Sequence, residues 1–191
     1  RTGDLLYSEI EEDLRASVRA LLEKRSPWDA VLARTESAET TDRELWALLA
    51  GEIGCAALAV PEAAGGAGAS WREAAVVAEE LGRAVAPVPF LGSAGIAVAL
   101  LLELDQRDLL SGIADGSVVA AVAVPFATPP GAATEWADVS GDRISGVVRG
   151  VADAAVADIF LVPTADALYV VDAEAPGLRR TEIVSLDMTR P

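Results

Sequence analysis

The stretch QRDLLSGIADGSVVAAVAVP, residues 106–125, contains the change of hydrophobic pattern that decides the fold. Up to Ala114 its apolar residues recur at spacings of three and four, as in an amphipathic helix. After the turn signal Asp115-Gly116 the chain becomes a continuous β-branched run, which is typical of a strand. The pattern therefore predicts an α+β fold, with an N-terminal all-helical domain (residues 1–116) followed by a β-domain (residues 117–191).

Upstream of this change, helical periodicity and capping signals predict five helices. The sequences TDRE (41–44) and SWRE (70–73) both have the Ser/Thr-x-x-Glu form of a capping box. The expected helices cover 4–25, LWALLAGEIG after Thr41, 70–84, 92–103 and 106–114, the last with Asp105 as N-cap. Between them we expect a polar loop at 26–40 and an extended segment CAALAVP at 55–61.

Downstream of the change, short apolar runs are separated by Gly, Pro and Asp turns. They predict strands in SVVAAVAVP (117–125), ISGVV (144–148), DIFLVP (158–163), ALYVV (167–171) and RTEIV (180–184).

Composition excludes several classes of site. The chain has no His and one Cys, which removes Ser-His-Asp and Cys-His catalysis, His-ligated metals and Cys-rich zinc sites. The net charge of -15 disfavours binding to nucleic acids and anionic membranes. We expect no membrane span, signal peptide or disulfide, a buried Cys55, and therefore a cytoplasmic protein.

Two motifs are candidates for chemistry, and both have a plainer interpretation. The loop PEAAGGAG (61–68) precedes a predicted helix and would suit an anion, but it lacks the residues of a phosphate-binding loop, so we interpret it as a tight turn. Glu79 and Glu80 are adjacent on a helix and diverge by about 100°, so we expect a solvated face rather than an acid–base pair.

The remaining polar and aromatic candidates also favour structural roles. We expect Arg179, Arg180 and Arg190 to form ion pairs, since acidic residues outnumber basic ones by 30 to 15. Core or interface packing is expected for Trp28, Trp46, Trp71 and Trp136. The sequence identifies no catalytic residue and no metal ligand.

A series of short motifs carries a family resemblance. In order they are GEIG (51–54), LAVPE (58–62), GGAG (65–68), EELGR (79–83), L-x-x-I-A-x-G within 109–116, Ala157-Asp158, Pro176-Gly177 and LDxTR (186–190). Each is weak alone, but together they resemble the acyl-CoA dehydrogenases over nearly the whole chain. The resemblance implies the helical domain and an incomplete antiparallel β-domain of that family, with its C-terminal four-helix bundle absent from this span.

The resemblance also implies an activity, namely FAD-dependent α,β-dehydrogenation of an acyl-CoA thioester. A Glu usually borne by the C-terminal bundle removes the α-proton in this family. Members that bind FAD usually carry a T-E-P-x-A/G-G-S-D-like segment and a Trp-Ile-Thr/Ser segment against the flavin ring. Here these places read VPFATPP (124–130) and RGVA (149–152), which puts flavin binding by this chain in doubt and leaves its cofactor-binding residues unknown.

Three hypotheses follow. The chain belongs to a flavin-poor partner subunit of a heteromeric acyl-CoA dehydrogenase, which we favour; to a catalytic homomeric enzyme; or to a noncatalytic interaction module of the same fold. The first implies a second subunit that supplies FAD and the catalytic Glu, and an acyl-CoA substrate with a fatty or steroid side chain.

Overall fold

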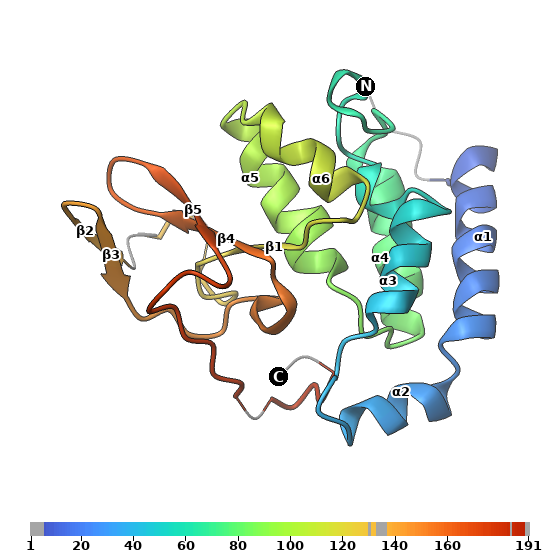
Figure 1. Cartoon of the computed structure of the whole chain (residues 1–191). Coiled ribbons are helices and arrows are strands. Elements are labelled where there is room, and N and C mark those ends of the chain that lie inside the picture. Colours follow the sequence, from blue (N-terminus) through green and yellow to red (C-terminus); the bar gives the residue numbers. More distant parts are fainter. Residues whose placement is uncertain (1–5, 130, 133–136, 184, 190–191) are drawn as a thin grey trace.

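The computed structural model describes residues 6–129, 131–132, 137–183 and 185–189, and it consists of a helical part followed by a smaller β part (Figure 1). The helical part contains α1 (Glu9–Arg25), α2 (Trp28–Thr35), α3 (Arg43–Gly51), η1 (Cys55–Ala57), η2 (Glu62–Ala64), α4 (Trp71–Arg83), η3 (Phe90–Ala97), α5 (Val98–Glu103), η4 (Arg107–Leu109) and α6 (Leu110–Ala114). The β part contains β1 (Ala120–Val122), β2 (Ala137–Ser140), β3 (Arg143–Gly146), η5 (Ala154–Val156), β4 (Ile159–Pro163) and β5 (Leu168–Asp172). The predicted α+β class is confirmed.

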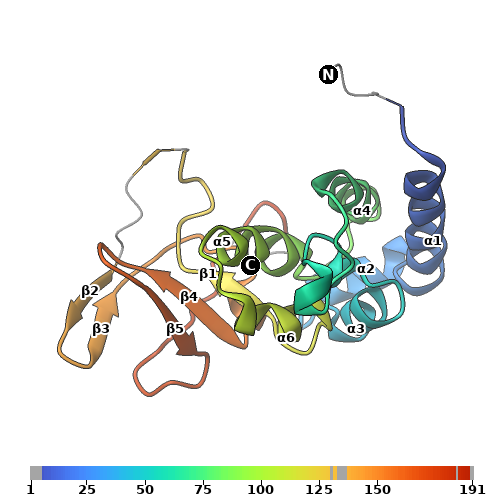
Figure 2. The same ribbon diagram turned by 90° about the horizontal axis from the view of Figure 1, so that it is seen from above.

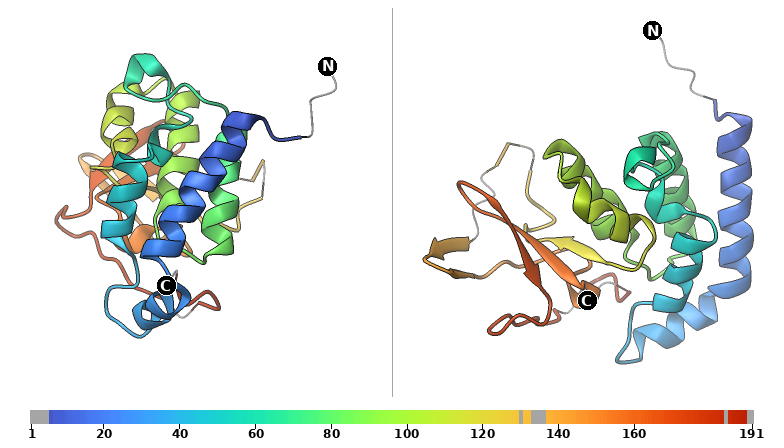
Figure 3. Two further views of the ribbon diagram at one scale, coloured as in Figure 1. Left: turned by 90° about the vertical axis from the view of Figure 1, so that its right-hand side faces the viewer. Right: turned by 45° about the horizontal axis from the view of Figure 1, so that its top comes forward.

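The helices pack in layers beside the sheet. α1 lies on the outside against α4, and η3 and α5 lie between these helices and β1, as Figures 1 and 2 show from two directions. The hairpin β2–β3 lies at the end of the molecule farthest from α1 (Figure 3). No helix in the described part of the chain is both long and apolar enough to cross a membrane.

The sheet is mixed. β4 pairs with β5 and β2 with β3 in the antiparallel sense that we expected, but β1 pairs with β4 in parallel. The parallel pair is possible because the connection 123–158 is long enough to cross over and return. One hydrophobic cluster continues from Leu110 and Ile113 of α6 to Ala120 of β1 and Leu161 of β4.

Two predicted helix starts differ in outcome. Ser70 is the N-cap of α4, and a capping box with Glu73 is present, as predicted. α3, however, is capped by Asp42 and not by Thr41, because the Asp42 carboxylate accepts from the Leu45 N–H at 2.9 Å. The same carboxylate pairs with Arg34 at 3.0 Å, which holds it in place.

Four further expectations were wrong. The predicted loop 26–40 contains α2, which begins directly after Pro27, a residue suited to a helix start. CAALAVP is not extended: its first three residues form η1, and residues 58–60 continue as turns and a bend. Asp105 is not an N-cap; it has a φ of 53° and its carboxylate accepts from Arg107. Residues 180–183 form no strand, and Val184 lies outside the described residues.

Candidate functional site

The glycine-rich loop 61–68 is a tight turn, as predicted. Gly65 and Gly68 have φ values of 84° and 60°, which side chains rarely allow. The N–H groups of Gly65, Gly66 and Gly68 donate to Glu62, Pro61 and Val60 carbonyl groups, respectively. Because these donors are used within the loop, they are not directed at an anion.

Glu80 contradicts the expectation of a solvated face, whereas the exposed Glu79 agrees with it. Glu80 is only 1% exposed, and its carboxylate accepts from Arg19 at 2.6 and 2.9 Å, from Arg15 at 3.1 Å and from Arg83 at 3.1 Å. Glu79 is exposed and lies 2.9 Å from the Arg15 guanidinium. The two carboxylates therefore meet at Arg15, which α1 places against α4.

The cluster joins α1 to α4 through ion pairs between the arginines of α1 and the glutamates of α4. The hydrogen bonds from Arg19 above all, and then those from Arg83 and Arg15, hold the pKa of Glu80 at about 2 against an ordinary value of 4.5. A carboxyl group with so low a pKa is a poor general base near neutral pH. The cluster is therefore structural.

The structural role expected for the arginines of the β part is confirmed for Arg180. Its guanidinium donates to two backbone carbonyl groups at η5, at 3.1 and 3.2 Å, and lies 3.6 Å from Glu174. Arg179 is exposed, and Arg190 lies outside the described residues.

The tryptophans separate into two groups. Trp46 is 2% exposed and lies in the core together with Cys55, so core packing is confirmed for Trp46 and burial for Cys55. Trp28 and Trp71 are 77% and 49% exposed, so core packing was wrong for these two and only the interface alternative remains for them. Trp136 lies outside the described residues.

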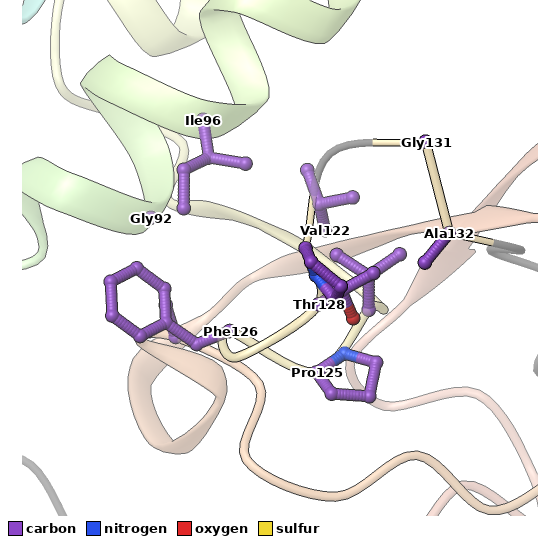
Figure 4. Close-up of a pocket in the computed structure, with 11 residues that line it drawn as sticks. Gly92, Ile96, Val122, Pro125, Phe126, Thr128, Gly131 and Ala132 are labelled. Atoms are coloured by element: carbon purple, nitrogen blue, oxygen red, sulfur yellow. The ribbon is translucent and has the colours of Figure 1, made fainter.

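An apolar pocket of ≈ 340 Å³ lies where η3, β1 and the loop after β1 meet (Figure 4). Gly92 and Ile96 of η3 and Val122 of β1 form one side. Residues from 124–129 and 131–132 form most of the rest, and Ala152 completes it. The structure thus brings together the two segments, 124–130 and 149–152, to which the resemblance assigns contacts with the flavin ring; Pro130 lies outside the described residues.

Two hydrogen bonds hold these segments in place. The Phe126 N–H donates to the Gly150 carbonyl at 2.8 Å, which joins the two segments directly. The Gly92 N–H donates to the Asp153 carboxylate at 2.7 Å, which ties the second segment to the start of η3. Sequence reasoning missed Gly92 and Asp153 because no local motif indicates that residues so far apart will meet.

The hydrogen-bonding groups of the loop show whether the pocket suits a flavin ring, whose pyrimidine edge needs several partners. The N–H groups of Val124, Phe126, Thr128 and Ala132 all donate to backbone carbonyl groups nearby. Pro125 has no N–H. Among the lining side chains that the structure describes, only Thr128 has a hydrogen-bonding group. The residues described here therefore do not fit a flavin ring in the manner of the family.

The sequence of the chain matches a known protein family and several of its members. Residues 8–107 match the model of the acyl-CoA dehydrogenase N-terminal domain. A relative, the acyl-CoA dehydrogenase IpdE2 of Mycolicibacterium smegmatis, is 44% identical over 115 residues, which cover 60% of this chain and 37% of the relative. The matched stretch thus spans well under half of that relative's length.

Solved structures share the fold over most of the chain. The ChsE4-ChsE5 complex from Mycobacterium tuberculosis matches with a TM-score of 0.79 and 28% identity, covering 95% of this chain and 52% of that one. A variant of the Tcur3481-Tcur3483 steroid ACAD matches with a TM-score of 0.72 and 34% identity, covering 88% and 49%. The first is a complex of two differently named proteins, and the second also carries two protein names.

Two other structures of this fold, 17% and 20% identical to the chain, are complexes with FAD or FADH2. The family match covers more than half of the chain, and the relatives that it resembles are named acyl-CoA dehydrogenases. The chain therefore belongs to the acyl-CoA dehydrogenase family of oxidoreductases.

Proposed function

We propose that this chain is part of a partner subunit of a heteromeric acyl-CoA dehydrogenase, and that it does not itself bind the flavin ring. A second, unlike subunit of the same family supplies FAD and the glutamate that removes the α-proton of the acyl-CoA. No residue of this chain acts as catalyst. The protein works in the cytoplasm, and 1–116 and 117–191 are its helical and β-domains within this span.

The observation that carries the proposal is a hydrogen bond between the two segments that correspond to the family's flavin-binding segments, the one after β1 and the one at 149–152. The Phe126 N–H, which would otherwise be available to a cofactor, donates to the Gly150 carbonyl at 2.8 Å. The lining around them offers apolar surface and a single hydroxyl group, that of Thr128. A ring with several polar atoms would lose hydrogen bonds to water there and regain few of them.

Two of the similar structures support the other part of the proposal, namely that this chain works together with a second, unlike subunit. ChsE4-ChsE5 is a complex of two differently named proteins, and Tcur3481-Tcur3483, which also carries two protein names, is described as a steroid ACAD. By analogy we propose that the substrate is an acyl-CoA with a bulky, ring-bearing acyl group.

The test is to produce the natural protein that contains this chain both alone and together with its candidate partner. Flavin is quantified from the visible absorbance, and dehydrogenation of an acyl-CoA is followed with an artificial electron acceptor. We expect a colourless, inactive protein alone and an active complex with one FAD for each pair of subunits. Stoichiometric FAD in the protein alone would show that it belongs to an ordinary catalytic homomer, and a complex without activity would favour the interaction module.

A further inference from the structure

The outer edge of β5 carries a row of unpaired backbone groups. In the described part of the chain the sheet order is β1-β4-β5, so β5 is an edge strand (Figure 1). Hydrogen-bonded positions alternate along an antiparallel pair, and the Ala173 N–H donates to the Asp158 carbonyl, so every second residue back from Ala173 bonds to β4. The N–H and C=O groups of Leu168 and Val170 therefore point away from β4, and no other backbone group among the described residues bonds to them. Such an edge is a template for a further strand.

A groove with mostly apolar side chains lies directly beside this edge. It is lined by Leu104, Gln106 and Leu109 of the connection between α5 and α6 and by Leu168 and Val170 of β5, and its volume is ≈ 250 Å³. We call it the β5 groove. Leu104 and Val170 are 43% and 49% exposed, so the apolar surface of the groove is open to solvent. Because small-molecule sites usually measure about 300–1,000 Å³, the groove suits single side chains rather than a whole small molecule.

The surroundings of the β5 groove are acidic. All but one of the charged residues that lie within two sequence positions of a lining residue carry a negative charge: the acids are Glu103, Asp105, Asp108, Asp166 and Asp172, and the base is Arg107. Arg107 is already bonded to Asp105 at 2.7 Å. The groove therefore repels an acidic segment, including β5 of a second copy of this chain, and attracts a segment that carries lysine or arginine.

We propose that the outer edge of β5 and the β5 groove bind an extended segment of the unlike subunit, with apolar residues at alternate positions and basic residues at its ends. The segment adds a strand to the sheet through hydrogen bonds with Leu168 and Val170. Residues opposite each other in a strand pair project to the same face, so its apolar side chains enter the groove. The inference rests on the proposed function, which supplies the unlike subunit.

The experiment measures binding of a fluorescent peptide, Lys-Val-Thr-Val-Thr-Val-Lys, to the natural protein alone and to its complex with the partner. Dissociation constants come from fluorescence anisotropy. We expect the peptide to bind to the natural protein alone and not to the complex, where the partner's segment already occupies the edge. A peptide with glutamate in place of both lysines should bind about tenfold more weakly, because the acids around the groove repel it.

Two N-methylated peptides separate strand pairing from charge attraction. In the proposed arrangement the valines face the groove and bond to β5, whereas the N–H groups of the threonines point away from it. N-methylation of the central valine removes a hydrogen bond to β5 and should weaken binding about tenfold. N-methylation of the threonine before it should leave binding nearly unchanged, and equal effects of the two changes would show that no strand is added.

A substitution in this chain shows whether the peptide binds at β5. Val170→Lys places a cation in the groove and on the strand edge, where lysine is known to discourage pairing. It should weaken binding of the lysine peptide about tenfold and should also weaken assembly with the partner. The control is Val139→Lys, at a valine of β2 that is 42% exposed and lies outside the groove; it should leave both unchanged.

The outcomes separate this inference from the proposed function. If the natural protein alone does not bind the lysine peptide, if the complex binds it equally well, or if Val170→Lys behaves like Val139→Lys, the inference is wrong while the proposed function stands. If no unlike subunit associates with the natural protein, both are wrong. Should Val170→Lys fail to fold, the two N-methylated peptides still decide, because they require no substitution in the protein.

Discussion

The carboxylate of Asp153 accepts a hydrogen bond of 2.7 Å from the N–H of Gly92, although 61 residues separate the two in sequence. Gly92 is the third residue of η3, where backbone N–H groups have no partner within the helix. A residue of the β part therefore caps a helix of the helical part, and the contact fixes one wall of the apolar pocket.

This contact predicts that Gly92→Ala is destabilising. A Cβ atom at this position would lie 2.7 Å from Asp153 Oδ2 and 2.9 Å from the Ala152 carbonyl oxygen, so the backbone must shift. We expect a loss of about 1–3 kcal/mol in the free energy of unfolding, measured by chemical denaturation. The control is Gly51→Ala in α3, where nothing lies within 4 Å and the change should be stabilising; equal effects at both sites would contradict the prediction.

The backbone conformation of Val85 predicts that replacing this residue by glycine stabilises the protein. It follows α4 with a φ of 49°, a conformation that is unfavourable for a β-branched residue and that glycine usually provides at helix ends. Val85→Gly should raise the free energy of unfolding by about 1 kcal/mol. Ala84→Gly, at a neighbouring residue with a φ of -88°, should lower it instead, and the prediction fails if both variants move in the same direction.

The buried ion cluster predicts unequal effects of two adjacent substitutions. Glu80→Gln leaves the guanidinium groups of Arg15, Arg19 and Arg83 without their shared buried carboxylate, and it should cost about 3 kcal/mol of unfolding free energy. Glu79→Gln removes an exposed partner and should have a much smaller effect. Chemical denaturation of both variants under the same conditions measures whether Glu80→Gln loses more unfolding free energy than Glu79→Gln.

The same cluster predicts a dependence of stability on pH. The pKa of Glu80 is lowered from 4.5 to about 2 in the folded protein, chiefly by its hydrogen bonds with Arg19. A lowered folded-state pKa gives stability that is fully present above pH 4.5 and is lost as the pH falls toward 2. Glu11, whose pKa is also about 2, adds to the loss. We therefore expect Glu80→Gln to show a shallower fall in unfolding free energy over this pH range than the natural protein, and equal slopes would be evidence against it.

We predict that the thiol of Cys55 resists alkylation while the protein is folded. It is 1% exposed, and burial raises its pKa to about 12, so little reactive thiolate forms near neutral pH. Iodoacetamide should label it only after denaturation, which mass spectrometry can measure. Rapid labelling of the native protein would show that the η1 region opens readily.

Features that depend on a few neighbouring residues could be predicted from the sequence. The spacing of apolar residues predicts α1 and α4, the Ser70 capping box predicts the start of α4, and the glycines of 61–68 predict a tight turn. The change of pattern at Asp115-Gly116 separates helices from strands. These signals are local because periodicity, caps and left-handed turns are set within one or two turns of chain.

Features that depend on distant partners were decided only by the tertiary structure. Glu80 is buried because guanidinium groups 61 and 65 residues earlier in the chain compensate its charge, which helical periodicity cannot reveal. β1 runs parallel to β4 because the long connection between them returns the chain in the same direction. The pocket exists because Gly92 lets Asp153 approach and Phe126 bonds to Gly150; each of these pairs is far apart in sequence, and only packing brings its members into contact.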